Sequence, residues 1–528
     1  MRLLFSNTWT YKAIVLIIII AIACYVLPIF IQITKFDFSV LSNGVAERNC
    51  AWLRSTIFSF ISSLFNVFCS LWLAIHLRKF TLFSKRGTFL SLLILPALMG
   101  DVSIAFIGKV LLANSTILHE NSIFKFISLI LIQFWQYGTL FTYIFWLVIQ
   151  SIKEPVNSYS IGVKMTNSEY LKDVILPSTK NIAVLIFVLN FIFAFFENAK
   201  SQFIFRASRG TNSEFISRWL EKYYQSNTLF NIDTAITHTL QLGAATMLSV
   251  LLLIILMTIM LVFFYKGYLT SKYYLPSIRS EIFSNILYIA VLFLLLSPIA
   301  WIILELVFTT TFSLDHLFPV IVITFIASII STFLSIQIGI LLRLAWKTTM
   351  STFSNKSLIF YSLILIILLF PPLVLYILGF KWLSVIGYQN SFLIKCVWVI
   401  GHVLLVLPIL SSFIAVTHYR TTNYEIEFID SYKLNYQDKI RVLFNRRYLL
   451  DYSLTLFIAF SFIWNESTIN NLLSDFVPSF ISEMKMSISG RGTDYSSGIG
   501  YFFVSLSLAF LSIALWNFIV GKIKVKIM

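Results

Sequence analysis

The chain has 528 residues, of which 58% are hydrophobic and only 12% charged, a composition that excludes an ordinary water-soluble protein and indicates a polytopic membrane protein. Its net charge of +16 comes from bases in short loops between apolar runs, which favours a membrane surface over nucleic acid as their partner. The four cysteines are scattered and no alternating strand pattern occurs, which argues against a disulfide framework, a CxxC metal site and a β-barrel.

Apolar runs follow one another along the whole chain, and several reach the roughly 20 residues that a helix needs to cross about 30 Å of hydrocarbon. The first run, Tyr11 to Ile33, is too long for a signal-peptide core and has no small-residue cleavage site, so we expect it to be retained. The pattern predicts an all-α fold of about twelve transmembrane helices, six in residues 1–265 and six in 266–528. The predicted helices are 13–33, 56–77, 88–112, 124–149, 181–203, 238–264, 284–308, 317–344, 358–380, 393–416, 449–470 and 498–520.

Lysine and arginine gather in alternate loops. If the amino terminus lies inside, the inner segments hold most of the 39 Lys and Arg residues, and the main basic outer segment is a longer loop near Lys200. Short loops rich in Lys and Arg stay on the cytoplasmic side of a membrane, whereas longer loops obey this rule weakly. We therefore expect both termini and the loops 151–180 and 418–448 to be cytoplasmic.

These two inner loops also resemble each other. The stretch Ser158 to Pro177, SYSIGVKMTNSEYLKDVILP, aligns with Glu427 to Arg446, EFIDSYKLNYQDKIRVLFNR, and the register continues until Glu197 meets Glu466. A repeat at the same place in each set of six helices predicts two homologous halves, each with its own cytoplasmic loop.

Each repeated loop has the spacing of a short amphipathic helix, because Tyr159 and Val163, like Phe428 and Tyr432, are four residues apart. Such a helix either lies on the lipid surface or lays its apolar face in a groove of another protein. Its occurrence at the same place in both halves favours a paired docking site for a partner with two-fold symmetry.

No catalytic motif occurs in the chain. The sequence has no GxxxxGK[ST] phosphate loop, no HExxH or GxSxG, and no zinc-type cluster of cysteine and histidine. The six histidines are dispersed. We therefore expect no catalytic residue, metal site or cofactor in this chain, so that active transport would take its energy from a partner or an ion gradient.

In its two repeated loops the chain resembles the fused, two-repeat permeases of bacterial binding-protein-dependent ABC importers, the group that includes ferric-iron and thiamine systems. The cytoplasmic motif of that family reads E-A-A-x-x-x-G-x9-I-x-L-P and forms the coupling helices that dock into the ATPase subunits. The first copy here ends in VILP, Val174 to Pro177, and the second keeps the acidic start at Glu427 but has Arg446 at the proline; both have a lysine at the glycine. The resemblance assigns ATPase coupling to Ser158, Tyr159, Val163, Lys164, Val174, Pro177, Glu427, Phe428, Tyr432, Lys433 and Leu443.

The resemblance covers most of the chain after the first helix. Leu53 to Gly100 looks like the family's second helix, basic turn and third helix ending in Leu-Pro, and LLFPPLVL, Leu368 to Leu375, is its counterpart in the second half. The resemblance implies a multi-pass permease of the bacterial inner membrane, surrounded by lipid, that carries a small solute and is not itself an enzyme. It also implies paired ABC ATPase subunits that bind ATP and a periplasmic or lipid-anchored substrate-binding protein; no nucleic acid is involved.

Two other classes remain as alternatives. A secondary transporter of the major-facilitator kind also has six plus six helices, but there the long inner connection normally joins the halves, and the basic turn Arg78 to Gly87 would carry an acidic residue. A polytopic transferase would need acidic or histidine clusters at a membrane face, and the sequence shows none.

Polar residues inside apolar runs are the remaining signal, because such groups usually face the bundle interior or a cavity. Asp101, Asn190, Glu197 and Glu466 are candidates for the translocation path. The repeat places the two glutamates alike, so we expect them to lie opposite one another near the external end of the path. There they would form an outer gate, attract a cationic solute, or bond at the water interface; the sequence does not identify the solute.

Overall fold

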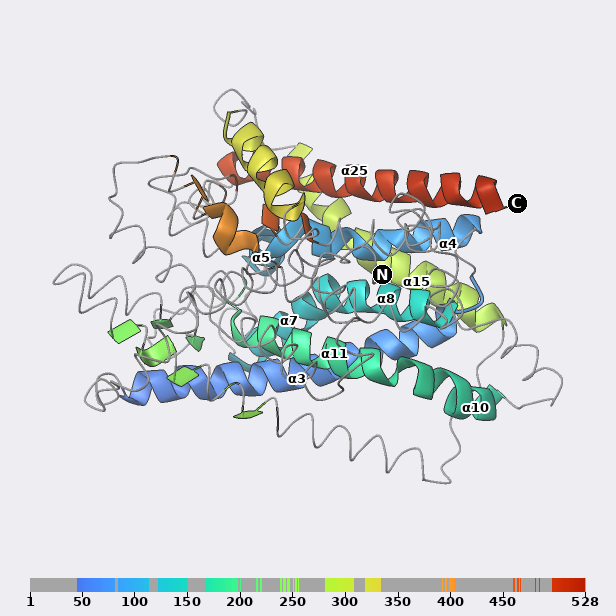
Figure 1. The fold of residues 1–528 in the computed structure, drawn as a ribbon, viewed down its shortest axis with the longest axis horizontal. Coiled ribbons are helices and arrows are strands. Elements are labelled where there is room, and N and C mark those ends of the chain that lie inside the picture. Colours follow the sequence, from blue (N-terminus) through green and yellow to red (C-terminus); the bar gives the residue numbers. More distant parts are fainter. Residues whose placement is uncertain are drawn as a thin grey trace, which may run out of the picture. The chain divides into compact units, whose positions relative to one another are not determined.

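The computed structural model describes residues 45–80, 84–113, 122–150, 167–197, 281–307, 319–333 and 496–527, with separate residues between 200 and 255 and between 392 and 484. Within these ranges the chain is almost entirely helical and has no strand (Figure 1). Helices long and apolar enough to cross a membrane span Glu47–Leu77, Lys85–Val110, Ile123–Gln150, Ile282–Leu304 and Gly500–Val520. The described part is therefore all-helical, with several helices of the kind found in multi-pass membrane proteins; the twelve-helix arrangement stays a prediction.

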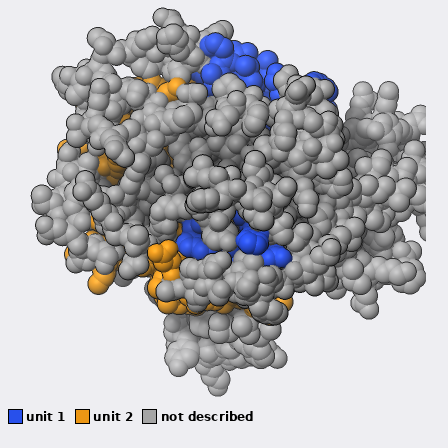
Figure 2. All heavy atoms as spheres, turned by 90° about the vertical axis from the view of Figure 1, so that its left-hand side faces the viewer, with its two compact units in different colours: residues 1–46, 217–249, 315–483 blue, residues 47–216, 250–314, 484–528 orange. Residues whose placement is uncertain are grey.

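The chain divides into two compact units (Figure 2). Unit 1 comprises residues 1–46, 217–249 and 315–483, and unit 2 comprises 47–216, 250–314 and 484–528. The predicted halves, 1–265 and 266–528, were inferred from a sequence repeat, which is a different criterion from spatial compactness. The two halves therefore stay a prediction.

Unit 2 contains most of the described helices, and three of its segments depart from α-helical geometry: η1 is a 3₁₀ turn, while η2 and η3 are π-helical turns. The elements are α3 (Val45–Leu77), α4 (Lys85–Leu90), η1 (Ser91–Ile94), α5 (Leu95–Ala113), α7 (Ser122–Gln133), η2 (Phe134–Gly138), α8 (Thr139–Gln150), α10 (Asn167–Tyr170), η3 (Leu171–Ile175), α11 (Leu176–Phe195), α15 (Glu281–Val307) and α25 (Ser496–Ile527).

Several helix bounds differ from those predicted. The first described helix, α3, begins at Val45 rather than 56, and α25 covers Ser496–Ile527 rather than 498–520. Helices continue beyond the hydrocarbon into water, where polar residues such as Arg48 are tolerated, so an apolar run marks only the buried part. The predicted helices 13–33 and 358–380 lie outside the described residues.

One face of α3 is polar and buried. Its side chains are small, so neighbouring helices can approach closely and share hydrogen bonds. Ser70 Oγ donates to the carbonyl of Gly138 at 2.7 Å, and Ser55 Oγ accepts from the backbone N–H of Ile216 at 3.0 Å. The fully buried members of this stripe are Ser55, Ser59, Ser62, Ser63, Asn66 and Ser70.

The opposite face of α3 is apolar and exposed. This pattern reverses that of a soluble protein and is the one expected when lipid is the solvent, because apolar side chains lose nothing by facing hydrocarbon. The side chains on this face are Leu53, Ile57, Ile61, Phe65, Phe68 and Trp72.

One end of unit 2 brings together helix ends that carry basic residues. Gln150 Nε2, at the end of α8, donates to the carbonyl of Arg78 at 2.6 Å, and the Arg78 guanidinium lies 5.1 Å from the centre of the Tyr170 ring in α10. Arg86 Nη1 donates to Asn285 Oδ1 of α15 at 2.7 Å. We call this the basic end; α4, α10 and the carboxyl end of α25 all lie there (Figure 1).

The helix α25 packs along α5. Ser505 Oγ donates to the carbonyl of Met99 at 2.8 Å, and farther along α25 Trp516 Nε1 donates to the hydroxyl oxygen of Tyr143 at 2.8 Å. Because Tyr143 lies toward the basic end of α8, these bonds direct the carboxyl end of α25 to the same side.

Unit 1 has a smaller described core, built on an apolar helix at Pro319–Phe333. Trp464 packs against Phe325 and Phe480 at ring distances of 6.3 and 5.2 Å, and the Phe480 N–H donates to Thr324 Oγ1 at 3.0 Å. Aromatic rings, of which Trp464 and Phe480 are buried, therefore join three segments that are far apart in the sequence.

Candidate functional site

A buried ionic cluster lies in unit 2, and its centre is Lys200. The Lys200 side chain is fully buried, and its Nζ lies 3.0 Å from Asp101 Oδ1, 2.9 Å from Glu197 Oε2 and 2.6 Å from Gln136 Oε1. An ammonium group has three donors, so these three acceptors satisfy it. The charged cluster consists of Asp101, Gln136, Tyr137, Glu197 and Lys200.

Two further contacts fix the geometry of the charged cluster. The Tyr137 hydroxyl donates to Asp101 Oδ1 at 3.0 Å, while the face of its ring lies 4.9 Å from Lys200 Nζ, within cation–π range. The backbone N–H of Lys200 donates to Glu197 Oε1 at 2.7 Å. Each carboxylate is therefore held by at least two partners.

The first helix break that forms the cluster is at Gly100. Gly100 has φ 80° and ψ 168°, which interrupts α5 between Met99 and Asp101. Only glycine adopts this backbone conformation without strain. Asp101 therefore begins the second part of α5, where the positive end of the helix dipole favours its carboxylate.

The second irregularity is the π-helical turn η2, which supplies Gln136 and Tyr137. Such turns leave carbonyls without their usual donors and frequently occur at functional sites. Here the Gly138 carbonyl accepts from both Ser70 Oγ, at 2.7 Å, and Thr142 Oγ1, at 2.8 Å. The turn is thus stabilised by hydroxyl groups from α3 and α8.

The third break is the end of α11 at Phe195, where the Phe196 and Glu197 N–H groups make the last bonds to Ile192 and Ala194. The helix was predicted to continue to residue 203. Because α11 ends earlier, Glu197 and Lys200 can turn toward Asp101. A helix that continued through them would keep Lys200 apart from Asp101. Irregular backbone at membrane depth is tolerated where protein or a cavity surrounds it.

Charge and exposure are unequal within the charged cluster. One lysine faces two carboxylates, so the ionised cluster has one net negative charge. The Lys200 and Glu197 side chains are 0% and 3% exposed, whereas that of Asp101 is 33% exposed. Asp101 is therefore the member that a cation or a proton can reach first.

Asn190 belongs to a different contact. Its Oδ1 accepts from Asn66 Nδ2 at 3.0 Å, and its Nδ2 donates to Ser63 Oγ at 3.1 Å, all of them buried. These bonds join α11 to the polar face of α3. Among the described contacts, Asn190 thus has a role in helix packing.

The two repeated glutamates each have a basic neighbour in their own unit. Glu197 pairs with Lys200, while Glu466 Oε2 in unit 1 lies 3.8 Å from Nε2 of the buried His402. His402 Nδ1 lies 2.8 Å from the carbonyl of Trp398, so Nδ1 carries a proton there and Nε2 faces the glutamate. That the two glutamates oppose one another stays a prediction.

Of the predicted coupling residues, only Val174 and Pro177 lie in the described part. Val174 is buried in η3, and Pro177 is exposed in the first turn of α11. The others lie outside the described residues: Ser158, Tyr159, Val163, Lys164, Glu427, Phe428, Tyr432, Lys433 and Leu443.

Next to these residues, Tyr170 and Arg78 form a contact at the basic end. Burial raises the pKa of the Tyr170 hydroxyl, and the Arg78 charge acts in the opposite direction. Burial lowers the pKa of the Arg78 guanidinium, which Tyr170 partly offsets. Since both groups normally titrate well above neutrality, the pair is a neutral ring beneath a charged guanidinium.

Lys200 and Tyr137 of the charged cluster were not among the sequence candidates, and Gln136, a polar residue in an apolar run, was not singled out for the translocation path. Lys200 had been assigned to an outer loop, where a charge needs no partner. A lysine three residues after a glutamate inside an apolar run was the available signal, because a buried charge there requires a partner.

Comparison with family models, with curated proteins and with solved structures gives no match to this chain. Within the described ranges, no group of three or more His, Cys, Asp or Glu side chains lies together as metal ligands would. The functional argument therefore rests on the ionic contacts and helix breaks of the chain itself.

Proposed function

We propose that this chain is the permease subunit of an ABC-type importer in a bacterial inner membrane. It moves a small solute by alternating access, and a separate ATPase supplies the energy. The observation that carries the proposal is the continuous helical segment from Asn167 to Phe195, formed by α10, η3 and α11.

This segment connects the two predicted functional regions. It begins within the predicted cytoplasmic loop 151–180, three residues after the predicted coupling residue Lys164, and it ends two residues before Glu197 of the charged cluster. At about 1.5 Å per residue it is roughly 40 Å long. A partner that moves the cytoplasmic loop would therefore displace the charged cluster at the other end.

The charged cluster fits a translocation path. Buried ionisable residues in membrane helices mark solute and ion pathways, and discontinuous helices commonly form such sites. Counted from Lys85 along α4, η1 and α5, Asp101 is about 24 Å from the basic end, most of the way across the hydrocarbon. The net negative charge and the exposed Asp101 favour a cationic solute.

The basic end supports the proposed orientation. Arg78 and Arg86 make their contacts there, and the carboxyl end of α25 lies on the same side (Figure 1). By the positive-inside rule this end faces the cytoplasm. Both termini are then cytoplasmic, and paired ATPase subunits that bind ATP dock on this side. A periplasmic or lipid-anchored binding protein delivers the solute from the other side. In this proposal the chain is no enzyme and needs no cofactor of its own.

One observation favours the alternative, a secondary transporter of the major-facilitator kind. Carboxylates paired with a buried lysine are a common arrangement for coupling transport to protons, because protonation of one carboxylate releases its partner. Solute uptake that is driven by a proton gradient, in proteoliposomes that contain the chain but no ATPase, would support this class.

The docking loops provide the test of the ATPase proposal. Replacing Val163 and Tyr432 by Asp places charge on the predicted apolar faces, and the ATPase should no longer co-purify with the chain. The matched control replaces Asn157 and Asn435 by Asp in the same loops, where retention should stay at the wild-type level. Full ATPase retention and unchanged uptake in the Val163/Tyr432 variant would contradict the proposal.

A further inference from the structure

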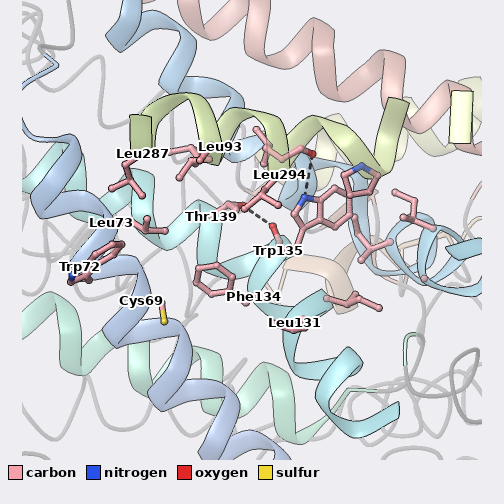
Figure 3. Close-up of a pocket in the computed structure, with 18 residues that line it drawn as sticks. Cys69, Trp72, Leu73, Leu93, Leu131, Phe134, Trp135, Thr139, Leu287 and Leu294 are labelled. Carbon is pink, nitrogen blue, oxygen red and sulfur yellow. Dashed lines mark hydrogen bonds between the residues drawn. The ribbon is translucent and has the colours of Figure 1, made fainter. Parts of the chain in front are cut away.

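An apolar cavity of about 500 Å³ lies in unit 2, and none of the residues of the charged cluster lines it (Figure 3). Its walls come from α3, α5, α7, η2, α8 and α15, and its lining is almost entirely apolar. At its rim the side chains of Trp72, Leu131 and Leu294 are 46%, 52% and 65% exposed. The cavity therefore opens on the apolar surface that faces hydrocarbon.

The walls of the cavity are fixed by hydrogen bonds. Trp135 Nε1, in the π-helical turn, donates to the carbonyl of Leu295 in α15 at 3.2 Å, and Thr139 Oγ1 donates to the Trp135 carbonyl at 2.8 Å (Figure 3). Pro298, which has no N–H, follows in the same wall. The few polar groups of the lining are thus engaged with one another, so an occupant must be apolar.

The size of the cavity matches one hydrocarbon chain. A buried apolar cavity of about 150 Å³ binds benzene, which has six carbon atoms. In proportion, about 500 Å³ holds roughly twenty carbons, the size of one acyl chain of a phospholipid. A small solute would leave most of this volume empty.

One end of the cavity leads to a basic surface. Leu93 lines the cavity seven residues after Arg86, which is about 10 Å along the helix. Leu287 lines it two residues after Asn285, the partner of the Arg86 guanidinium at 2.7 Å. Lys85 and Arg86 are both exposed. A chain lying in the cavity would therefore have its polar end beside two cations.

We propose that the cavity binds one acyl chain of an anionic phospholipid of the surrounding membrane, with the phosphate headgroup against Arg86. Guanidinium groups bind phosphate through charge-assisted hydrogen bonds. Such a site holds a specific lipid rather than the exchanging lipid that covers the rest of the surface. Because α15 and α3 both line it, the lipid joins two helices that otherwise meet through few polar contacts.

The test measures lipid retained by the full-length protein in mild detergent, using native mass spectrometry with added phosphatidylglycerol or phosphatidylethanolamine. Ala290→Phe fills the cavity from an exposed position on α15 and should lower phosphatidylglycerol occupancy by more than about tenfold. Ile289→Phe, at the neighbouring exposed position outside the lining, should leave occupancy unchanged.

The headgroup is tested separately. Arg86→Gln should lower phosphatidylglycerol occupancy about fivefold and remove the preference over phosphatidylethanolamine. The control Arg54→Gln removes the same charge from α3, at a position outside the cavity lining, and should change neither.

Three results would overturn the proposal: equal retention in Ala290→Phe and Ile289→Phe, no headgroup preference in the wild type, or a retained apolar compound that is not a phospholipid. If Ala290→Phe does not yield folded protein, a second measurement replaces it. Brominated phosphatidylglycerol should quench the tryptophan fluorescence of the wild type more than that of Arg86→Gln. Quenching that is equal in both would also overturn it.

Discussion

At the scale of single residues, the buried ammonium of Lys200 determines the stability of the charged cluster. Removing one partner of a buried ionic group leaves an uncompensated charge, which costs about 3–5 kcal/mol. Lys200 has the most partners, since Asp101, Glu197 and Gln136 all bind its Nζ. Substitution of Lys200 should therefore cost more stability than substitution of one of its carboxylate partners.

We expect Lys200→Met to destabilise the protein by about 3–5 kcal/mol, because the buried Glu197 and the partly exposed Asp101 carboxylates would lose their shared cation. Glu197→Gln keeps the shape and leaves one carboxylate facing one ammonium, so its stability should stay near that of the wild type. The measurement is the midpoint of thermal unfolding in detergent. Adding Asp101→Asn and Glu197→Gln to Lys200→Met should restore stability, which separates the charge effect from lost packing; a Lys200→Met protein as stable as the wild type would contradict the buried ion pair.

At the scale of the helices, the breaks matter more than the regular turns. Gly138 closes the π-helical turn, and a Cβ built on it would overlap Cδ2 of the Phe134 ring. Phe134 is itself held against Phe65 at a ring distance of 5.2 Å. The ring therefore has little room to move away.

Gly138→Ala should consequently destabilise the protein by about 1–3 kcal/mol, the usual cost of an extra buried methyl that forces side chains to shift. Thermal unfolding of the purified protein measures it. Phe134→Leu in the same chain should recover part of the loss, because it removes the ring atoms that the methyl meets. An unchanged unfolding midpoint for Gly138→Ala would show that the turn is not packed as described.

The sequence was informative about helices and less informative about how they end. Apolar runs located the helical segments Lys85–Ala113, Ser122–Gln150 and Glu281–Val307 to within a few residues, because hydrocarbon thickness dictates their length. They did not reveal the early end of α11 at Phe195, since FFENAK contains neither Gly nor Pro. Beyond that end Lys200 meets Asp101, a contact between segments far apart in the sequence.

The same reason limits what could be predicted of the charged cluster. Asp101 and Glu197 were identified because a carboxylate in an apolar run is conspicuous. Their common partner was not, because three segments far apart in the sequence come together only once the helices pack. The break at Gly100 was likewise not predicted, as a lone glycine in an apolar helix is usually tolerated.

At the scale of the whole molecule, the predicted sequence repeat makes Glu197 and Glu466 corresponding residues. Each glutamate faces a basic side chain within its own unit, Lys200 in one and His402 in the other. If the halves are related by a two-fold axis, these two pairs are equivalent positions on one translocation path. The repeat then predicts an energetic coupling between Glu197 and Glu466, which can be measured.

Uptake by Glu197→Gln, Glu466→Gln and the double variant forms a double-mutant cycle, with the amount of folded protein checked in each. Groups that act on the same solute or gate show coupling energies of about 0.5–3 kcal/mol, whereas distant independent groups are additive. We expect coupling, so that the loss of uptake in the double variant departs from the product of the single losses by more than about twofold. Glu169→Gln, an exposed change in α10, combined with Glu197→Gln should be additive and serves as the control. Additive losses for the two repeated glutamates would mean that each acts only within its own unit, and the shared path would then have to be abandoned.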